Sequence, residues 1–212
     1  MTYPDLLPQI IELARSAGAA IMEIYETADF GVEAKKDNSP LTKADKAAND
    51  LICAGLEKLP TQYPIISEEN KETPYEVRRT YTSFWLVDPL DGTKEFIKRN
   101  GEFTVNIALV EGQHPVMGVV YAPVLDECYA AVKGQGAFVE KSGERKQLMA
   151  TDFDVTDKGL RVVCSRSHLN DATQAFVDQL NEPVLVSKGS SLKFLLLADR
   201  QAELYPRLAP TM

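Results

Sequence analysis

The chain has 212 residues, with 31 acidic against 23 basic side chains and a formal net charge of −8 at pH 7. Its hydrophobic content of 44% is ordinary for a globular protein and excludes a disordered, collagen-like or coiled-coil chain. Proteins hold the phosphate backbone of nucleic acids with clustered Lys and Arg, so the acidic balance also argues against nucleic-acid binding.

Neither a targeting segment nor a membrane segment is visible. The N-terminus lacks a basic stretch followed by an apolar one, and no run approaches the roughly 18 apolar residues of a membrane span. The cysteines Cys53, Cys128 and Cys164 are odd in number and far apart, which argues against a disulfide framework or a structural zinc site. We expect a soluble, cytoplasmic protein with reduced thiols.

Apolar residues recur at helical spacing over residues 6–25 and predict an amphipathic helix, with Pro8 tolerated in its first turns. A second helix is expected to begin at Thr42, because Thr42 and Asp45 have the spacing of a capping pair, and to end before Pro60. The inner face of this helix is expected to carry Ala47, Leu51, Ile52 and Leu56.

Short β-rich runs separated by glycine-containing turns follow and predict an antiparallel meander. The expected strands cover residues 64–67, 83–88, 104–110, 116–121, 127–132 and 137–140. After a polar boundary at residues 151–159, strands and helices alternate, which predicts an α/β layer. Its expected strands cover residues 161–164, 184–186 and 202–205, and its expected helices cover residues 171–180 and 191–199.

An apolar strand leads directly into the acidic run Asp88-Pro89-Leu90-Asp91-Gly92-Thr93. Its Pro and Gly predict a sharp turn, so the two carboxylates and the Leu90 carbonyl are expected to converge as oxygen ligands beside the helix start at Thr93. Oxygen ligands without His or Cys favour Mg²⁺. A second acidic pair, Glu68-Glu69, follows an earlier strand, and it would meet the first if the two strands are neighbours.

Each acidic feature also has a purely structural interpretation. Asp, Pro and Gly populate turns for local backbone reasons, and Glu68-Glu69 could be a solvated loop end. Asp45, at the third position of its helix, could simply cap that helix. Residue type and spacing alone leave both interpretations open.

Taken together, the Asp88-Pro89-Leu90-Asp91-Gly92-Thr93 run, Ser67-Glu68-Glu69 and Leu41-Thr42-x-x-Asp45 resemble the inositol monophosphatase superfamily of lithium-sensitive, Mg²⁺-dependent phosphatases. Further segments are similar to the bacterial 3'(2'),5'-bisphosphate nucleotidases of sulfate assimilation, namely Lys94-Glu95-Phe96, Cys164-Ser165-Arg166-Ser167-His168 and Gly189-Ser190-Ser191-Leu192-Lys193-Phe194. The resemblance covers essentially the whole chain. It implies an α+β fold, a layered αβαβα sandwich, with a metal-binding part over residues 1–155 and an incomplete substrate-contacting part over residues 156–212.

The resemblance also implies roles for individual residues. The ligands of two or three Mg²⁺ ions are expected to be Glu68, Asp88, the Leu90 carbonyl and Asp91. Asp45 and Thr93 are expected to orient and activate the attacking water. Glu69 is expected to support the metal ligands without binding the metal itself. The expected substrate contacts are Glu68, Leu90, Asp91, Gly92, Thr93, His168, Ser190, Lys193 and Arg207. Without the resemblance, Lys193 reads as a solvated helix lysine, His168 as a loop residue and Arg207 as the partner of a surface acid.

The activity implied is removal of the 3'-phosphate from adenosine 3',5'-bisphosphate, giving AMP and phosphate in sulfur assimilation, with the sulfated relative of this nucleotide as a further candidate substrate. Two alternatives stay open: an inositol or sugar monophosphatase on the same scaffold, and a non-catalytic metal- or nucleotide-binding module. The sequence does not give the oligomeric state. Some members of the family are peripheral on the cytoplasmic side of the inner membrane, although no anchor is visible here.

Members of the family continue past the equivalent of Met212 into a Trp-Asp motif that supplies another metal ligand, followed by a helix and closing strands. This sequence ends where that motif is expected to begin. The resemblance therefore predicts a fragment of a longer enzyme or a truncated product, with one weakened metal site and much reduced activity.

Overall fold

The computed structural model describes residues 3–27, 29–35, 40–164 and 170–208. The chain divides into two compact units, Met1–Gln147 and Leu148–Met212. We describe each unit by itself. The separate metal-binding and substrate-contacting roles expected for two parts of the chain stay predictions.

Two helices of the first unit confirm the expected amphipathic segments. Helix α1 spans Tyr3–Tyr25 and contains Pro8 in its second turn, where proline removes the hydrogen bond that a backbone N–H would give to the Pro4 carbonyl. Helix α2 spans Lys43–Leu56, and both hydrogen bonds of a capping box form between Thr42 and Asp45. The predicted inner face of α2 is confirmed for Ile52 and Leu56, and Leu51 is half-buried but packs against the core; Ala47 is half-buried and does not belong to the core. The buried apolar residues of α2 are Ala44, Ala48, Ile52 and Leu56.

In the described part of the chain, the large sheet contains seven strands in sequence order. They are β3 (Ile65–Ser67), β4 (Ser83–Asp91), β5 (Thr104–Glu111), β6 (His114–Ala122), β7 (Glu127–Val132), β8 (Gly136–Lys141) and β9 (Glu144–Leu148). The expected antiparallel meander is confirmed from β4 to β8. It is wrong for β3, which pairs parallel to β4, because residues 68–82, with the short helix α3 (Tyr75–Arg78), bring the chain back to the same end of the sheet.

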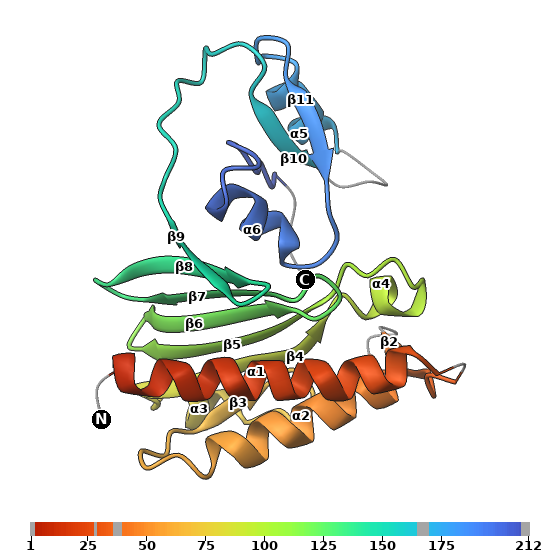
Figure 1. Ribbon diagram of the computed structural model, residues 1–212, viewed down its shortest axis with the longest axis vertical. Helices are drawn as coiled ribbons and strands as arrows, with labels where there is room; N and C mark the ends of the chain where they lie inside the picture. Colours follow the sequence, from red (N-terminus) through yellow and green to blue (C-terminus); the bar gives the residue numbers. More distant parts are fainter. Residues whose placement is uncertain (1–2, 28, 36–39, 165–169, 209–212) are drawn as a thin grey trace. The chain divides into compact units, whose positions relative to one another are not determined.

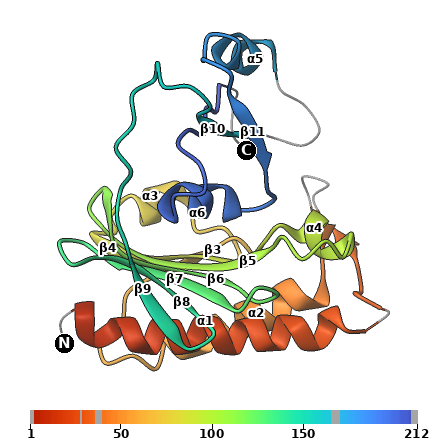
Figure 2. The same ribbon diagram turned by 45° about the horizontal axis from the view of Figure 1, so that its top comes forward.

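Helices α1 and α2 cover one face of this sheet, as both views show (Figures 1 and 2). Alternate strand residues point into the resulting core because side chains alternate between the two faces of a strand. In β4 and β5 these residues include Trp85, Val87, Ile107 and Leu109, each at most 2% exposed. On the opposite face Leu86 is 47% exposed. The core therefore fixes the register that carries Asp88 to its place.

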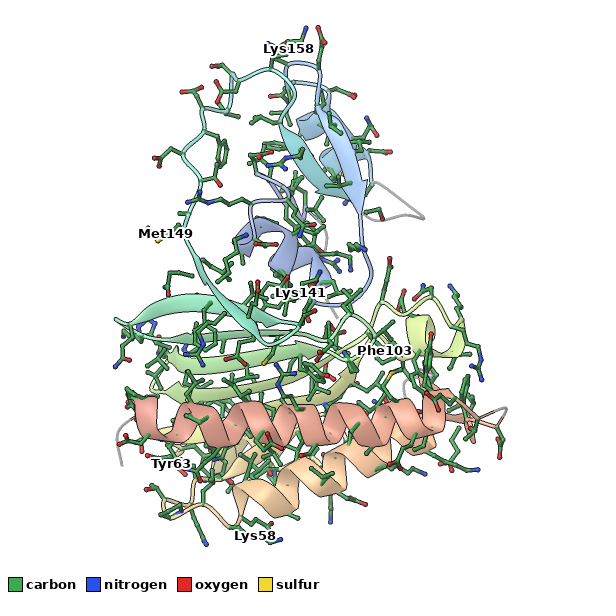
Figure 3. The ribbon with its side chains drawn as sticks, in the orientation of Figure 1. Lys58, Tyr63, Phe103, Lys141, Met149 and Lys158 are labelled. Atoms are coloured by element: carbon green, nitrogen blue, oxygen red, sulfur yellow. The ribbon has the colours of Figure 1, made fainter. Side chains whose placement is uncertain are left out.

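An aromatic cluster holds the short helix α4 (Thr93–Ile97) that follows β4. Phe96 is fully buried, and its ring centroid lies 5.1 Å from Tyr25, 4.8 Å from Phe30 and 5.2 Å from Phe103. Figure 3 shows Phe103 at the α4 end of the sheet. Edge-to-face and tilted ring pairs at these distances are favourable, so Thr93 starts a helix whose position is fixed by packing.

The second unit contains two parallel strands, β10 (Arg161–Cys164) and β11 (Val184–Ser187), and the helices α5 (Asp171–Val177) and α6 (Leu192–Ala198). The expected strand at residues 202–205 is wrong: the structure has only a single bridge between Leu204 and Val162. The Glu203 carboxylate accepts a 2.7 Å hydrogen bond from the Arg161 backbone N–H. The Glu203 side chain thus accepts from the Arg161 N–H, which in a longer strand pairing would donate to a backbone carbonyl.

Three further expectations concern the fold class, the cysteines and membrane-spanning helices. The α+β class is confirmed by the mixed sheet and its helices. All three cysteines are free thiols, with Cys128 and Cys164 buried and Cys53 partly exposed. Among the described residues, no helix combines the length and apolar character needed to cross a bilayer.

Candidate active site

The parallel pairing of β3 and β4 brings the two acidic segments together. Ser67 pairs with Val87, and the Glu68 backbone N–H donates to the Val87 carbonyl at 3.1 Å. Glu68 and Asp88 therefore follow neighbouring residues at the same edge of the sheet. The expectation that the two acidic segments meet if their strands are neighbours is confirmed.

Strand β4 does not turn at Pro89 as expected. It continues to Asp91, with a register shift between Asp88, paired with Asn106, and Asp91, paired with Thr104. One extra residue on β4 makes this a β-bulge, which re-aims the side chains around it. The sharp turn comes one residue later, at Gly92 with φ 99° and ψ 38°, a left-handed conformation that favours glycine.

Asp88 is half-buried, and one of its carboxylate oxygens has unused hydrogen-bonding capacity. Its Oδ1 atom is buried and accepts no hydrogen bond from the described residues, while the Leu90 backbone N–H donates to the carboxylate. Burial raises the pKa of Asp88 to about 8, and the negative charges of Asp91 and Glu68 add to that rise. Buried polar atoms without a partner are rare in folded proteins, so Asp88 is suited to an added cation.

Asp45 is buried, and both of its carboxylate oxygens accept hydrogen bonds. The Thr93 hydroxyl donates to Oδ1 at 3.1 Å, and the Thr42 backbone N–H and hydroxyl donate to Oδ2 at 2.7 and 2.5 Å. Burial raises the pKa of Asp45 although these hydrogen bonds oppose the rise. Asp45 both caps α2 and holds Thr93, so the capping and the chemical interpretations describe one arrangement.

Lys35 is a site residue that the sequence interpretation missed. Its Nζ atom lies 2.7 Å from Glu68 Oε1 and 2.5 Å from Glu69 Oε1. Burial lowers the pKa of Lys35, but the two glutamates outweigh burial and the net shift is upward. The sequence analysis assigned no role to Lys35, because no motif marks it and its partners lie more than 30 positions away. The ammonium group offsets part of the negative charge of the acidic pair.

The Glu68 and Glu69 side chains differ in exposure, at 51% and 8%. Burial raises the pKa of Glu69, while its contact with Lys35 opposes the rise. Glu68 is thus the member of the pair that solvent and ions reach more readily. This is consistent with the expected division between a ligand and a supporting residue.

The described residues do not form a finished metal cage: they contain no group of three or more His, Cys, Asp and Glu arranged to hold an ion. The expected convergence of Asp88, Asp91 and Glu68 is therefore only partial, because their charges act on one another without closing around a point. The donors still suit a hard cation, since they are oxygens and Asp88 Oδ1 is buried without a partner.

The expected substrate contacts outside the acidic region lie in the second unit. The Lys193 ammonium, on α6, donates to the Ser190 carbonyl at 3.3 Å, and Ser190 has a left-handed φ of 54°. Arg207 Nη1 donates to the Tyr205 hydroxyl at 3.3 Å, and the Tyr205 ring packs 5.2 Å from Phe194 of α6. Lys193, Ser190 and Arg207 are thus linked to α6, whereas His168 lies outside the described residues.

Comparison with known proteins gives a family and several relatives. Residues 4–212 match the Inositol monophosphatase family. The 3'(2'),5'-bisphosphate nucleotidase CysQ of Escherichia coli K12 is 50% identical over 207 residues, which cover 97% of this chain and 82% of the relative. The enzyme of the same name from Buchnera aphidicola is 44% identical over 99% of this chain and 77% of its own length.

Solved structures confirm the fold. The crystal structure of CysQ from Bacteroides thetaiotaomicron, described as a bacterial member of the inositol monophosphatase family, matches with a TM-score of 0.82 and 43% identity, over 96% of this chain and 80% of that one. SuhB from Bartonella henselae matches with a TM-score of 0.77 at 23% identity, over 95% and 78% of the two chains, which shows the shared fold alone. On the family match and these relatives together, this chain belongs to the inositol monophosphatase family.

Proposed function

We propose that this chain is a 3'(2'),5'-bisphosphate nucleotidase that removes the 3'-phosphate from adenosine 3',5'-bisphosphate and releases AMP and inorganic phosphate. The observation that carries the proposal is the 50% identity over 97% of the chain to an enzyme with that name. The hydrogen bond from the Thr93 hydroxyl to the buried Asp45, beside the acidic edge of the sheet, supports it. We place the reaction in the cytoplasm and in sulfur assimilation, with the sulfated nucleotide as a second substrate.

The acidic residues would hold the metal. Glu68, Asp88, the Leu90 carbonyl and Asp91 are the proposed ligands of two or three Mg²⁺ ions. When bound, Mg²⁺ supplies positive charge against the phosphate and lowers the pKa of the water that attacks it. The buried Oδ1 of Asp88, which has no hydrogen-bond partner among the described residues, is the atom that most needs this cation.

Asp45 and Thr93 would orient the attacking water and accept its proton. The Thr93 hydroxyl donates a hydrogen bond to Asp45 Oδ1. The Thr93 oxygen can therefore accept a hydrogen bond from the attacking water. As the water attacks phosphorus, its proton passes to the Thr93 oxygen while the Thr93 proton moves to Asp45. The bond from phosphorus to the 3'-oxygen breaks, and that oxygen takes a proton from solvent. The raised pKa of Asp45 makes it a better proton acceptor than an exposed carboxylate.

The second unit would bind the rest of the nucleotide. Lys193 and Arg207 are cationic, and a doubly phosphorylated ligand suits two cations better than a singly phosphorylated sugar does. We assign Ser190, Lys193, Arg207 and His168 to these contacts. Gly92 and Thr93 would contribute backbone N–H groups to the phosphate that is removed.

The test is phosphate release from adenosine 3',5'-bisphosphate, with inositol 1-phosphate as the competing substrate, in Mg²⁺ and in excess EDTA. We expect Mg²⁺-dependent release from the nucleotide and at least tenfold less from the inositol ester. Preference for inositol 1-phosphate would replace the proposal with an inositol phosphatase. Nucleotide binding by calorimetry without any phosphate release would replace it with a binding module.

A further inference from the structure

Asn49 lies on the buried face of α2, one turn after Asp45. Residues four apart on a helix lie on the same face, and Asp45 and Asn49 are 1% and 7% exposed. A carboxamide at a helix position this buried needs partners for its oxygen and its nitrogen. Besides the Cys53 thiol one turn later on α2, which lies 3.6 Å from its oxygen, the partners it finds are on the segment that carries the Glu68-Glu69 pair.

The Asn49 side chain brackets the acidic pair. Ser67, the residue before the pair, donates its hydroxyl to Asn49 Oδ1 at 2.6 Å, and this contact is buried. Asn70, the residue after the pair, accepts from Asn49 Nδ2 at 2.9 Å. One amide group therefore holds both ends of the segment that presents Glu68 and Glu69.

The Glu68 N–H anchors the start of this segment to β4, and Asn49 adds to weaker contacts that close the turn after it. The turn is closed by the Asn70 N–H donating to the Ser67 carbonyl at 3.3 Å and by the Glu69 N–H donating to the Ser67 hydroxyl at 3.4 Å, both near the long limit for hydrogen bonds. Asn49 makes shorter contacts to the same two residues. The Ser67 hydroxyl joins both sets, because it accepts from Glu69 and donates to Asn49.

Asn49 also links this turn to Asp45 and Thr93. Helix α2 presents Asp45 to Thr93 on α4 and, one turn later, presents Asn49 to Ser67 and Asn70. The position of the acidic pair is thus set against the residues that orient the water through α2 as well as through the β3–β4 pairing.

We propose that Asn49 is a positioning residue that sets the metal affinity of the acidic site by fixing the Ser67–Asn70 turn. The inference rests on the proposed function in taking Glu68 as a metal ligand. Partners that orient metal ligands are worth about 10- to 100-fold in metal affinity. Asn49 touches neither substrate nor metal, so its loss acts on metal binding and leaves the chemistry of the filled site in place.

The experiment measures Mg²⁺ binding to the metal-free full chain by calorimetry, with MgCl₂ as the titrant, for Asn49→Ala, Ser67→Ala and the double variant. We expect each single variant to weaken Mg²⁺ binding by about 10-fold or more. The double variant should be no more than about threefold weaker than the singles, because both remove the same contact. Phosphate release at saturating Mg²⁺ should stay within about threefold of the parent chain, while the Mg²⁺ concentration for half-maximal rate rises in step with the dissociation constant.

The matched control is Ile52→Val, which loosens the buried face of α2 one turn away without touching the turn. It should lower the melting temperature while leaving Mg²⁺ affinity unchanged. Equal weakening of Mg²⁺ binding by Ile52→Val would reduce Asn49 to a packing role and overturn the inference. Unchanged affinity in both Asn49→Ala and Ser67→Ala would overturn it as well. If Asn49→Ala does not fold, Ser67→Ala removes the same hydrogen bond with a smaller change and decides the question.

Glu68→Gln separates this inference from the proposed function. Unchanged Mg²⁺ affinity in Glu68→Gln would remove the ligand role on which the inference depends and overturn it. If the parent chain releases no phosphate from adenosine 3',5'-bisphosphate but the Asn49 and Ser67 variants still weaken Mg²⁺ binding, the proposed function fails and the inference stands.

Discussion

Asp45, at the start of α2, is buried, and Asp88, near the end of β4, is half-buried with one buried oxygen; desolvation raises the pKa of both carboxylates. Their surroundings are opposite. Asp45 accepts three hydrogen bonds from Thr42 and Thr93, whereas Asp88 Oδ1 has no donor among the described residues and faces the charges of two other carboxylates. The protein itself supplies hydrogen-bond donors to both oxygens of Asp45. Asp88 Oδ1 has no such donor among the described residues and is suited to an added cation. Burial alone therefore does not identify a ligand; the missing partner does.

Asp88→Asn should have the largest effect. Removing a charged ligand costs several kcal/mol of transition-state stabilisation, so phosphate release should fall about 10³-fold or more. The metal-free protein, in contrast, should melt at an equal or higher temperature, because a neutral amide relieves repulsion from Asp91 and Glu68. Activity assays and thermal melts in EDTA check both effects, with the exposed Asp50→Asn as the charge-matched control. A variant that keeps full Mg²⁺-dependent activity would remove Asp88 from the ligand set.

Asp45→Asn and Thr93→Val should each lower phosphate release by about 10²- to 10³-fold, since both interrupt the proton path to Asp45. The double variant should be little worse than either single one. Asp45→Asn should also cost about 1 kcal/mol of stability through the weakened cap, unlike Asp88→Asn. Thr93→Ser keeps the hydroxyl and is the control that should retain most activity; equal loss in Thr93→Ser would show that packing, not the proton path, is at stake.

The pH dependence of stability should distinguish the two carboxylates further. In EDTA the folded state holds a proton on Asp88 up to about pH 8, while the unfolded chain releases it near pH 4. Between these values the folded state binds more protons, so the free energy of unfolding contributed by Asp88 is present at low pH and is lost as pH rises towards 8. Urea unfolding at pH 5 and pH 8.5 measures this loss, and the difference should shrink in Asp88→Asn. An identical pH dependence in both proteins would contradict the buried state of Asp88.

Gly92→Ala should have the smallest effect on activity. Gly92 lies at the turn between β4, which carries Asp88, and α4, which begins with Thr93. At φ 99° a Cβ atom costs about 1–2 kcal/mol of stability, and relaxation of that strain shifts Thr93 away from Asp45. Chemical denaturation should show the stability loss together with a moderate fall in activity. Gly118→Ala on β6 is the control, because no atom lies within 4 Å of the added Cβ and its φ is not positive; if both variants behave alike, backbone strain at Gly92 has no role.

Elements with strong periodicity were predictable from the sequence, and elements held by distant partners were not. Helix α1, the Thr42 cap and β7 followed from local patterns. Strand β9 was missed because its sequence, Glu-Arg-Lys-Gln-Leu, is polar and mostly exposed. The expected strand at residues 202–205 failed because Glu203 bonds Arg161 across 42 positions, a pairing that no local pattern signals.

The candidate site divides in the same way. Asp45, Asp88 and Thr93 stood out because motif and spacing marked them. Lys35 and Asn49 did not, since their partners lie 33 and 18 positions away. The one available signal for Asn49 was a polar residue four positions after Asp45, on a helix face that is otherwise apolar.

Strand β3 has only three residues and lies at the edge of the sheet, paired on one side by β4. Short edge elements open locally at a lower free energy than the centre of a sheet. When β3 frays, Glu68 leaves Asp88 and the acidic site ceases to exist, although the rest of the unit stays folded. A cation bound by residues from both strands would hold this sheet edge together, so a short edge strand becomes better protected against local opening once the site is filled.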